Sequence, residues 1–235
     1  MKPRIISLWS GPRNVSTALM YSFAQRADTA VVDEPLYSHY LIETGADHPG
    51  RDEVIRSMPS DPAEIWRNLK TFDKPVLFVK NMAHHAIALN DEWYSSADPI
   101  LLIRDPEEML PSLRKQIPEP VLRDTGLAGQ RELLYRFLEA GRKPAVIDSG
   151  QLLRDPPSVL EKLCKAIELP FDQSMLSWQK GPRKEDGVWA KYWYHRIHES
   201  TGFEPYSPKK AAFPEELKPL LDICEPIYNE LLTYA

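Results

Sequence analysis

Short apolar, β-branched runs recur along the chain, each bounded by Pro, Asp, Ser or Gly. Runs of this length and composition predict buried β-strands, here over residues 4–9, 30–34, 75–80, 99–104 and 144–149. The stretches between them repeat apolar side chains at helical spacing. That spacing predicts helices over residues 15–26, 62–70, 107–117 and 127–140, and over 151–168 beyond the last strand.

Strands that alternate with helices predict a particular architecture. Right-handed crossovers make successive strands parallel and place helices on both faces of the sheet. We therefore expect an α/β fold of three layers, α/β/α, with a central parallel sheet and with ligands bound beyond the carboxyl ends of the strands. With 235 residues, 43% of them hydrophobic, the chain suits one domain over residues 1–235.

Two stretches near the end of the chain differ from this pattern. Residues 179–205 mix basic, histidine and aromatic side chains without a clear period, which predicts a loop or lid. Residues 214–234 place Leu217, Leu220 and Ile227 on one broad apolar face, which predicts a C-terminal helix packed on the body.

Composition and charge exclude several classes of protein. A net charge of −5 argues against a nucleic-acid partner, which needs a basic face. No apolar run reaches the roughly 18 residues of a membrane span, and the N-terminus lacks the apolar core of a signal peptide. Cys164 and Cys224 lie among apolar neighbours, as buried thiols do in a reducing compartment. We expect a soluble, cytoplasmic protein without membrane or nucleic-acid partners.

The first strand is followed by the segment SGPRNVSTAL, residues 10–19. Such a turn directs backbone N–H groups and the positive end of a helix dipole at an anion, and Arg13 adds a full charge. The turn and the helix start contain Gly11, Pro12, Arg13, Asn14, Val15, Ser16 and Thr17. The alternative is an ordinary polar loop with a Ser or Thr helix cap. The segment is not a GxxxxGK[ST] phosphate loop, because the Lys of that motif is absent, and this disfavours kinase chemistry.

This turn resembles the 5′-phosphosulfate loop of the sulfotransferase family, whose bacterial members often carry a PRSGTT-like string here. The resemblance implies a P-loop NTPase-like fold and 3′-phosphoadenosine 5′-phosphosulfate (PAPS) as sulfuryl donor, with the bisphosphate PAP as product. Arg13 would contact the transferred sulfuryl group, and Asn14, Ser16 and Thr17 would cradle the 5′-phosphate. Val15 stands where the family usually has Gly.

The fourth predicted strand ends on Arg104, and Ser112 follows eight residues later, about two turns into the next helix. The strand-Arg-x-Pro…Ser arrangement resembles the 3′-phosphate site of sulfotransferases, where Arg104 and Ser112 would clasp the donor, the guanidinium fork suiting a phosphate. The alternative pairs Arg104 with Asp105 or Glu108 in a salt bridge.

Two later stretches resemble the same family. Residues 144–178 resemble its strand, DP-containing loop and helix, which are scaffold. KGPRKEDGVWAKYW (180–193) resembles the loop that covers the donor, with about three extra residues before Gly187. Lys180, Arg183 and Lys184 are therefore candidate donor contacts, and the alternative is a solvated loop.

Three residues compete for the role of the base that accepts the proton of the sulfuryl acceptor. Glu34 follows the second strand within DEPL, which resembles the EPL or EPF string of sulfotransferases that use a Glu base. A partly buried carboxylate can have a pKa raised toward neutrality, which suits proton abstraction. The alternative is that Asp33 or Glu34 caps the next helix, and we favour Glu34 as the base.

His84 and His85 follow the third strand. The strand end resembles the Lys-Thr-His-Leu-Pro segment of cytosolic sulfotransferases, in which the His is the base, although here the histidines are displaced by two residues. By the same resemblance Lys80 would contact the bridging or sulfuryl oxygens. The chain's histidines and cysteines do not have metal-ligand spacing, so we expect no metal.

These residues together predict transfer of a sulfuryl group from PAPS to a hydroxyl or amine of a small-molecule acceptor. The acceptor is expected between residues 34–45, 84–94 and 185–206, where Trp189 and Tyr194 either line the pocket or pack in the core. The rival functions are a small-molecule or nucleotide kinase on the same fold and a non-catalytic protein that binds an adenosine bisphosphate. The sequence leaves the acceptor's identity and the oligomeric state open, a homodimer included.

Overall fold

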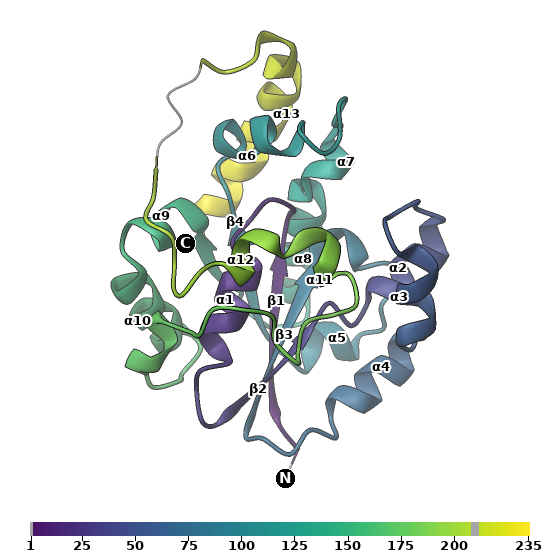
Figure 1. The fold of residues 1–235 in the computed structure, drawn as a ribbon, viewed down its shortest axis with the longest axis vertical. Helices are drawn as coiled ribbons and strands as arrows, with labels where there is room; N and C mark the ends of the chain where they lie inside the picture. The colour runs from purple at the N-terminus through teal and green to yellow at the C-terminus, as the bar shows by residue number, and fades with distance from the viewer. Residues whose placement is uncertain (1, 208–211) are drawn as a thin grey trace.

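A five-stranded parallel sheet forms the centre of the computed structural model, which describes residues 2–207 and 212–235 (Figure 1). The strand order is β2-β3-β1-β4-β5, and every neighbouring pair is parallel. The strands are β1 (Arg4–Ser10), β2 (Thr29–Asp33), β3 (Val76–Met82), β4 (Asp98–Ile103) and β5 (Ala145–Asp148). All five lie where the hydrophobic runs predict them.

The sheet separates two hydrophobic cores, because successive side chains of a strand point to opposite faces. In β1, Ile5 and Trp9 belong to one core, whereas Ile6 and Leu8 belong to the other. The other strands alternate in the same way. Near-continuous apolar runs are therefore what these strands require, since both faces are covered.

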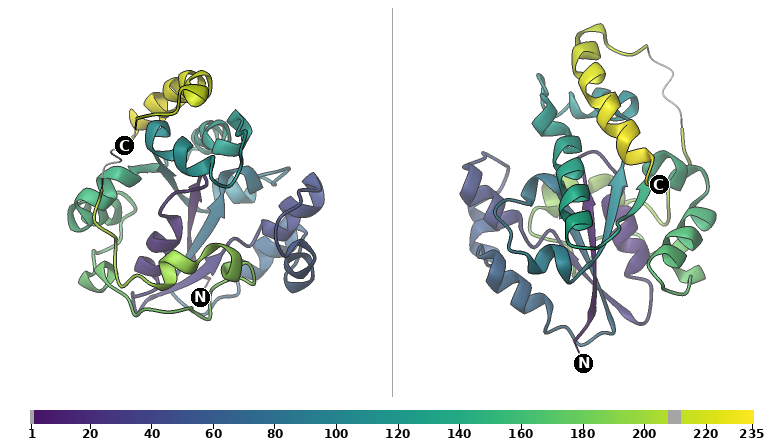
Figure 2. Two further views of the ribbon diagram at one scale, coloured as in Figure 1. Left: turned by 45° about the horizontal axis from the view of Figure 1, so that its top comes forward. Right: turned by 180° about the vertical axis from the view of Figure 1, so that it is seen from behind.

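Helices cover both faces of the sheet (Figure 2). The core that contains Leu8 is closed by α1 (Ser16–Phe23), α9 (Ser149–Arg154) and α10 (Pro156–Ala166). The core that contains Trp9 is closed by α4 (Pro62–Leu69), α5 (Glu92–Ser95), α6 (Pro106–Leu113), α8 (Leu127–Glu139) and α13 (Lys218–Leu232). The expected three-layer α/β/α fold is confirmed, and so is the C-terminal helix.

The prediction of one helix over residues 151–168 was wrong, because α9 and α10 are separate. Pro156 has no backbone N–H to donate and disfavours helical geometry at the residue before it. Asp155 accordingly leaves the helical region at φ −146° and ψ 74°, and its carboxylate accepts from Ser158 N at 3.2 Å as the cap of α10.

Two helices after β2 were not predicted from the hydrophobic pattern. Helix α2 (Tyr37–Thr44) buries Ser38 and His39 beside its apolar residues, so the buried face is not marked by hydrophobicity. Helix α3 (Arg51–Ser57) buries Val54 alone. Amphipathic periodicity is the signal that reveals a helix, and neither segment carries it. A single turn, α7 (Leu122–Thr125), precedes α8.

Residues 179–205, called the covering segment from here on, are irregular as expected, apart from the one-turn helices α11 (Ala190–Trp193) and α12 (His195–His198). Its two ends meet where Ser177 and Gly202 form an antiparallel bridge and Trp178 N donates to Thr201 O at 3.0 Å. The segment crosses in front of the upper ends of β1 and β3 in Figure 1. It therefore lies at the carboxyl edge of the sheet.

The described helices include none with both the length and the apolar character that a membrane crossing requires. Cys164 and Cys224 are free and buried, as predicted. The division of the chain into one domain stays a prediction.

Candidate functional site

The candidate residues gather where four parallel strands end. Arg13 follows β1, Glu34 follows β2, Lys80 lies near the end of β3, and Arg104 follows β4. Strand β1 is central, and the chain continues to β2 and β3 on one side of it and to β4 and β5 on the other. This edge of an open parallel sheet, where the connections diverge, is the usual place for a ligand.

Arg13 and the two residues predicted to hold a 3′-phosphate form one cluster. Arg13 adopts a left-handed backbone conformation with φ 55°, and its Nε donates to Ser112 Oγ at 3.0 Å. A guanidinium nitrogen of Arg104 donates to the carbonyl oxygen of Arg13. The structure therefore brings together Arg13, Arg104 and Ser112 from three separate parts of the chain.

Helix α1 begins beside this cluster. Its N-cap residue is Val15, whose side chain makes no capping hydrogen bond, and the first turn starts with Ser16 and Thr17. Asn14 is engaged with the backbone, because its Nδ2 donates to Leu102 O at 2.8 Å while its Oδ1 accepts from Val15 N at 2.9 Å. Asn14 thus fixes the loop to β4 at the start of α1.

The turn after β1 is packed tightly against the corner between α7 and α8. A Cβ atom at Gly11 would meet Thr125 O at 2.6 Å, and one at Gly126 would meet Gly11 Cα at 2.8 Å. Gln130 is buried in the same corner, and its Nε2 donates to Leu102 O at 2.8 Å. Glycine at position 11 is therefore required by the packing of the loop.

Positive charge is concentrated around Arg13 and Arg104. Burial lowers the pKa of the Arg13 guanidinium, and the charges of Arg104 and Arg196 lower it further. Burial lowers the pKa of Arg104 as well, although Glu108 lies 3.8 Å from its guanidinium and opposes this. The Nε of Arg104 is buried without a protein partner. Converging guanidinium groups with an unused donor are suited to a phosphate.

A second cluster of charges lies on β2 and β3. Asp33 and Lys80 are register partners on these strands, so their side chains share a face of the sheet. Lys80 Nζ donates to Asp33 Oδ1 at 2.9 Å, to Glu34 Oε1 at 2.5 Å and to Tyr194 OH at 2.8 Å. The Tyr194 hydroxyl donates to Asp33 Oδ2 at 2.7 Å. All four side chains are buried.

Glu34 and Asp33 share one ammonium group but differ in their surroundings. Two carboxylates beside one ammonium leave a net negative charge in a buried place, which is costly unless one takes up a proton. Burial raises the pKa of Glu34, and the Asp33 charge raises it further against the opposing effect of Lys80. Glu34 also has a left-handed backbone with φ 41°, held by its N–H donating to Lys80 O at 2.8 Å.

The histidines pack in an aromatic cluster beside the Glu34 site. His85 is buried and stacks on Tyr37 and Tyr40 at ring-centroid distances of 5.0 and 4.7 Å. Burial lowers the pKa of His85 well below its ordinary value and lowers that of His84 to about 4. Both rings are therefore neutral near pH 7.

The three cations of the covering segment that were predicted as donor contacts are placed differently. The guanidinium of Arg183 lies 4.6 Å from the ring centroid of Tyr21 on α1, and its buried Nε has no partner. Lys180 pairs with Glu199 at 2.5 Å on the surface, and the Lys184 side chain is 91% exposed. The structure thus brings Arg183 against α1 and leaves both lysines in solvent.

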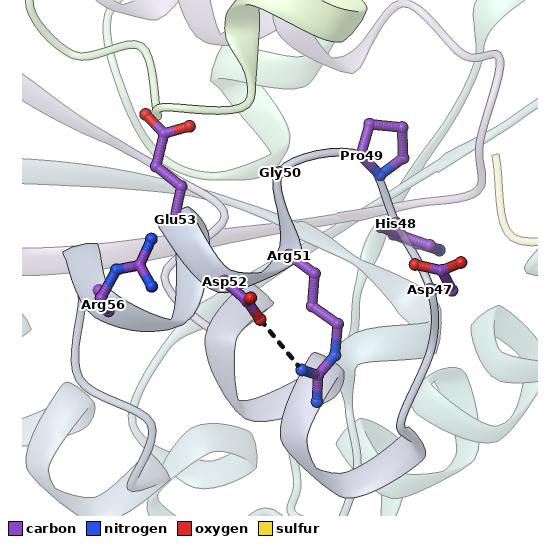
Figure 3. A pocket seen from close by; sticks show the side chains of 8 residues that line it. All are labelled: Asp47, His48, Pro49, Gly50, Arg51, Asp52, Glu53 and Arg56. Carbon is purple, nitrogen blue, oxygen red and sulfur yellow. Dashed lines mark hydrogen bonds and ion pairs between the residues drawn. The ribbon is translucent and has the colours of Figure 1, made fainter.

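A surface depression lies beside α3 and takes none of its lining from the strand ends (Figure 3). Its lining residues are Asp47, His48, Pro49, Gly50, Arg51, Asp52, Glu53 and Arg56. Arg51 pairs with Asp52 inside it at 3.4 Å. His48 connects it to the aromatic cluster, because Tyr37 OH and His48 Nδ1 are 2.8 Å apart.

In residues 2–207 and 212–235, no group of three or more His, Cys, Asp or Glu side chains is arranged to hold a metal ion.

Several residues of the site were not singled out by the sequence. Asp33 appeared only as a helix cap, and Tyr194 only as one of several aromatic residues. Gln130 and Asp186 were not considered, although Asp186 accepts from Tyr21 OH at 2.7 Å and holds the covering segment on α1. Strand order and register would have paired Asp33 with Lys80, and neither can be read from one sequence.

A family model and two curated relatives match most or all of the chain. A family model described as "Sulfotransferase domain" matches residues 3–235. The chain is 42% identical over 239 residues to "Branched-chain-amino-acid aminotransferase-like protein 1" of Arabidopsis thaliana. It is 39% identical over 230 residues to "Branched-chain-amino-acid aminotransferase-like protein 2" of the same plant. These matches cover 100% and 97% of the chain but 42% and 41% of the relatives, so the chain spans less than half of their length.

Solved structures share the fold at low sequence identity. A sulfotransferase from Alicyclobacillus acidocaldarius has a TM-score of 0.59 and 13% identity, and the match covers 99% of this chain and 95% of that one. The sulfotransferase domain of the Synechococcus PCC 7002 olefin synthase has a TM-score of 0.55 and 17% identity, with 94% of each chain covered. At these identities the likeness concerns the fold.

Proposed function

The chain belongs to the sulfotransferase domain family, and from this premise we propose that it transfers a sulfuryl group from PAPS to a hydroxyl or amine of a small acceptor. The observation that supports this most is the meeting of Arg13, Arg104 and Ser112 at the strand ends. This cluster is a cationic site beside the start of α1, and such a site suits a donor that carries two separate phosphate groups.

We assign each proposed donor contact from the position of the residue at the carboxyl edge of the sheet. Arg104 and Ser112 would bind the 3′-phosphate, and the backbone of Gly11 to Thr17 would bind the 5′-phosphate at the α1 N-terminus. Arg13 lies with Arg104 and Ser112, so we assign it to donor binding. Of the candidates Lys180, Arg183 and Lys184, Arg183 is the one proposed to join them, because its Nε is buried and unpaired beside α1.

Glu34 is the proposed base. Its raised pKa favours proton uptake from an acceptor, and Lys80 at 2.5 Å supplies a positive charge beside it. In the transfer step the acceptor loses its proton to Glu34, its oxygen or nitrogen bonds to sulfur, and the sulfur–oxygen bond to the 5′-phosphate breaks. Lys80 and the arginines stabilise negative charge on the departing phosphate. His84 and His85 are the alternatives, packed against Tyr40.

The acceptor is proposed to enter between α2, the loop after β3 and the covering segment. Tyr192 and Trp193 of α11 are 39% and 40% exposed, which provides an aromatic rim at this entrance. We infer a cytoplasmic location from the two unpaired, buried thiols.

The test is incubation of the protein with PAPS labelled with ³⁵S on the sulfuryl group and a panel of phenols, alcohols and amines. Labelled product that forms with the wild type and is lost in Glu34→Gln supports the proposal. Glu161→Gln, an exposed carboxylate on α10, is the matched control and should retain activity. Binding of PAP without label transfer to any acceptor class would favour a non-catalytic nucleotide-binding protein.

A further inference from the structure

Asp33 joins two parts of the molecule that are far apart in sequence. Its Oδ1 accepts from Lys80 at 2.9 Å, while its Oδ2 accepts from Tyr194 OH at 2.7 Å and from Gly187 N at 3.4 Å. Tyr194 and Gly187 belong to the covering segment, whereas Lys80 lies at the end of β3. One carboxylate thus connects the covering segment to the sheet.

Other contacts hold the covering segment on the helices without reaching Lys80, and two of them serve as a comparison. Lys191 pairs with Glu53 of α3 at 2.5 Å on the surface. Asp186 accepts from Tyr21 OH of α1 at 2.7 Å. By contrast, the contacts of Tyr194 with Asp33 and Lys80 reach the Glu34–Lys80 pair.

Tyr194 completes the enclosure of that pair. Its side chain is 5% exposed, its hydroxyl accepts from Lys80 at 2.8 Å, and Trp189 packs in the same cluster. If the covering segment moved away, Lys80 and Asp33 would lose this partner, and the Glu34–Lys80 pair would meet water. Hydration would remove the burial that distinguishes Glu34 from an ordinary carboxylate.

We propose that Asp33 is a positioning residue that fastens Tyr194 to Lys80, so that the Glu34–Lys80 pair is assembled when the covering segment is in place. The inference rests on the proposed role of Glu34 as base. In the proposed reaction, docking of the covering segment over the acceptor would then prepare the base. The hydrogen bonds of Asp33 go to Lys80, Tyr194 and Gly187 and not to the cluster of Arg13, Arg104 and Ser112.

The charged and titratable groups around Glu34 determine how the role of Asp33 can be measured. They are Asp33 of β2, Lys80 of β3, Tyr37 of α2 and Tyr194 of the covering segment. Replacing Asp33 by Asn removes a neighbouring negative charge and leaves Lys80 to Glu34 alone. Both changes favour the ionised form of Glu34, so the midpoint of its titration must fall to a lower pH.

The experiment uses the full chain with ¹³C-labelled glutamate side chains. The carboxyl signal of Glu34, assigned by its loss in Glu34→Gln, is titrated by NMR, and hydrogen exchange of residues 187–194 is followed by mass spectrometry. In Asp33→Asn we expect the Glu34 midpoint to fall by about one pH unit or more and exchange in this stretch to accelerate about tenfold. Glu53→Gln is the matched control, because it removes an attachment of the same segment that does not touch Lys80, and it should leave the Glu34 midpoint unchanged.

An unchanged Glu34 midpoint and unchanged exchange in Asp33→Asn would overturn the inference, as would an equal shift in Glu53→Gln. If Asp33→Asn does not fold, the Tyr194→Phe variant is the test. It removes the hydroxyl that binds Asp33 and Lys80 and leaves every charge in place. Faster exchange confined to residues 187–194 would support the inference, and unchanged exchange would refute it. These readouts need neither donor nor acceptor. Failure of the wild type to bind PAP would therefore contradict the proposed function without touching the role of Asp33.

Discussion

Arg13 Nε donates a 3.0 Å hydrogen bond to Ser112 Oγ across 99 residues of sequence. The contact ties the loop after β1 to the last turn of α6. It joins the two halves of the proposed donor site, which the sequence contains as two unconnected motifs. Whether these halves bind one molecule can be tested through their energetic coupling.

We expect Arg13→Gln and Ser112→Ala to be non-additive in their effects on PAP binding. Two residues that share a ligand and a hydrogen bond should show a coupling free energy of about 0.5–1.5 kcal/mol. The measurement is a double-mutant cycle by calorimetry. Additive effects within about 0.3 kcal/mol would mean that the two residues do not act on the same ligand.

Glu34→Gln should lower the rate of sulfuryl transfer by about 10²- to 10⁴-fold and leave PAP affinity unchanged, because a base contributes to the chemical step. In the wild type, the rate should fall as the pH drops through the raised pKa of Glu34, since a protonated carboxyl cannot accept the acceptor's proton. The acid limb should therefore lie above the ordinary glutamate value of 4.5. A profile that stays flat down to pH 4.5, measured with the best acceptor of the panel, would remove Glu34 from this role.

His84 should make folding stability depend on pH. Burial lowers its pKa from 6.5 to about 4, so between these values the unfolded chain binds more protons than the native protein. The free energy of unfolding therefore rises with pH in this window, and the stabilising contribution is lost as the pH falls from about 6.5 toward 4. Urea unfolding at pH 7.5 and 5.0 should show a smaller difference for His84→Gln than for the wild type. An equal difference in both proteins would show that His84 titrates normally.

Gly126→Ala should destabilise the protein more than Gly141→Ala. Both glycines have positive φ, 76° and 73°, but a Cβ atom at Gly141 meets nothing within 4 Å, whereas one at Gly126 meets Gly11 Cα at 2.8 Å. The shared conformational strain is about 1 kcal/mol, and displacement of the loop adds about 1–3 kcal/mol at Gly126. PAP affinity should fall in Gly126→Ala and stay unchanged in Gly141→Ala. Equal losses of stability and of PAP affinity in the two variants would show that the contact between Gly126 and Gly11 does not support the proposed donor site.

The sheet and most of its helices could be predicted because their residues carry regular periodicity. The runs RIISLW and PVLFVK are buried on both faces, and such runs read as strands without further information. Helix α2 escaped prediction because it buries Ser38 and His39, which hydrophobicity does not mark. Asp155 and Pro156 divide a helix that periodicity alone predicted as continuous.

The residues of the candidate site could be predicted from the sequence where they lie close together in the chain. Arg104 and Ser112 lie eight residues apart and Arg13 lies in a compact turn, so both places could be matched to short motifs of the sulfotransferase family. The contact of Asp33 with Lys80 depends on strand order, and that with Tyr194 spans 161 residues. Such long-range contacts depend on tertiary packing, which one sequence does not display.

The most direct test of the proposed sulfotransferase is calorimetric titration with PAP beside adenosine 5′-monophosphate and magnesium-ATP. Selective binding of PAP by the wild type is predicted, with a loss of about 1.5–3 kcal/mol in Arg104→Ala because a charged hydrogen bond is removed. Arg131→Ala, an exposed guanidinium on α8 that lies 3.9 Å from Glu230, should bind PAP as the wild type does. Absence of PAP binding, or a preference for magnesium-ATP, would contradict the account.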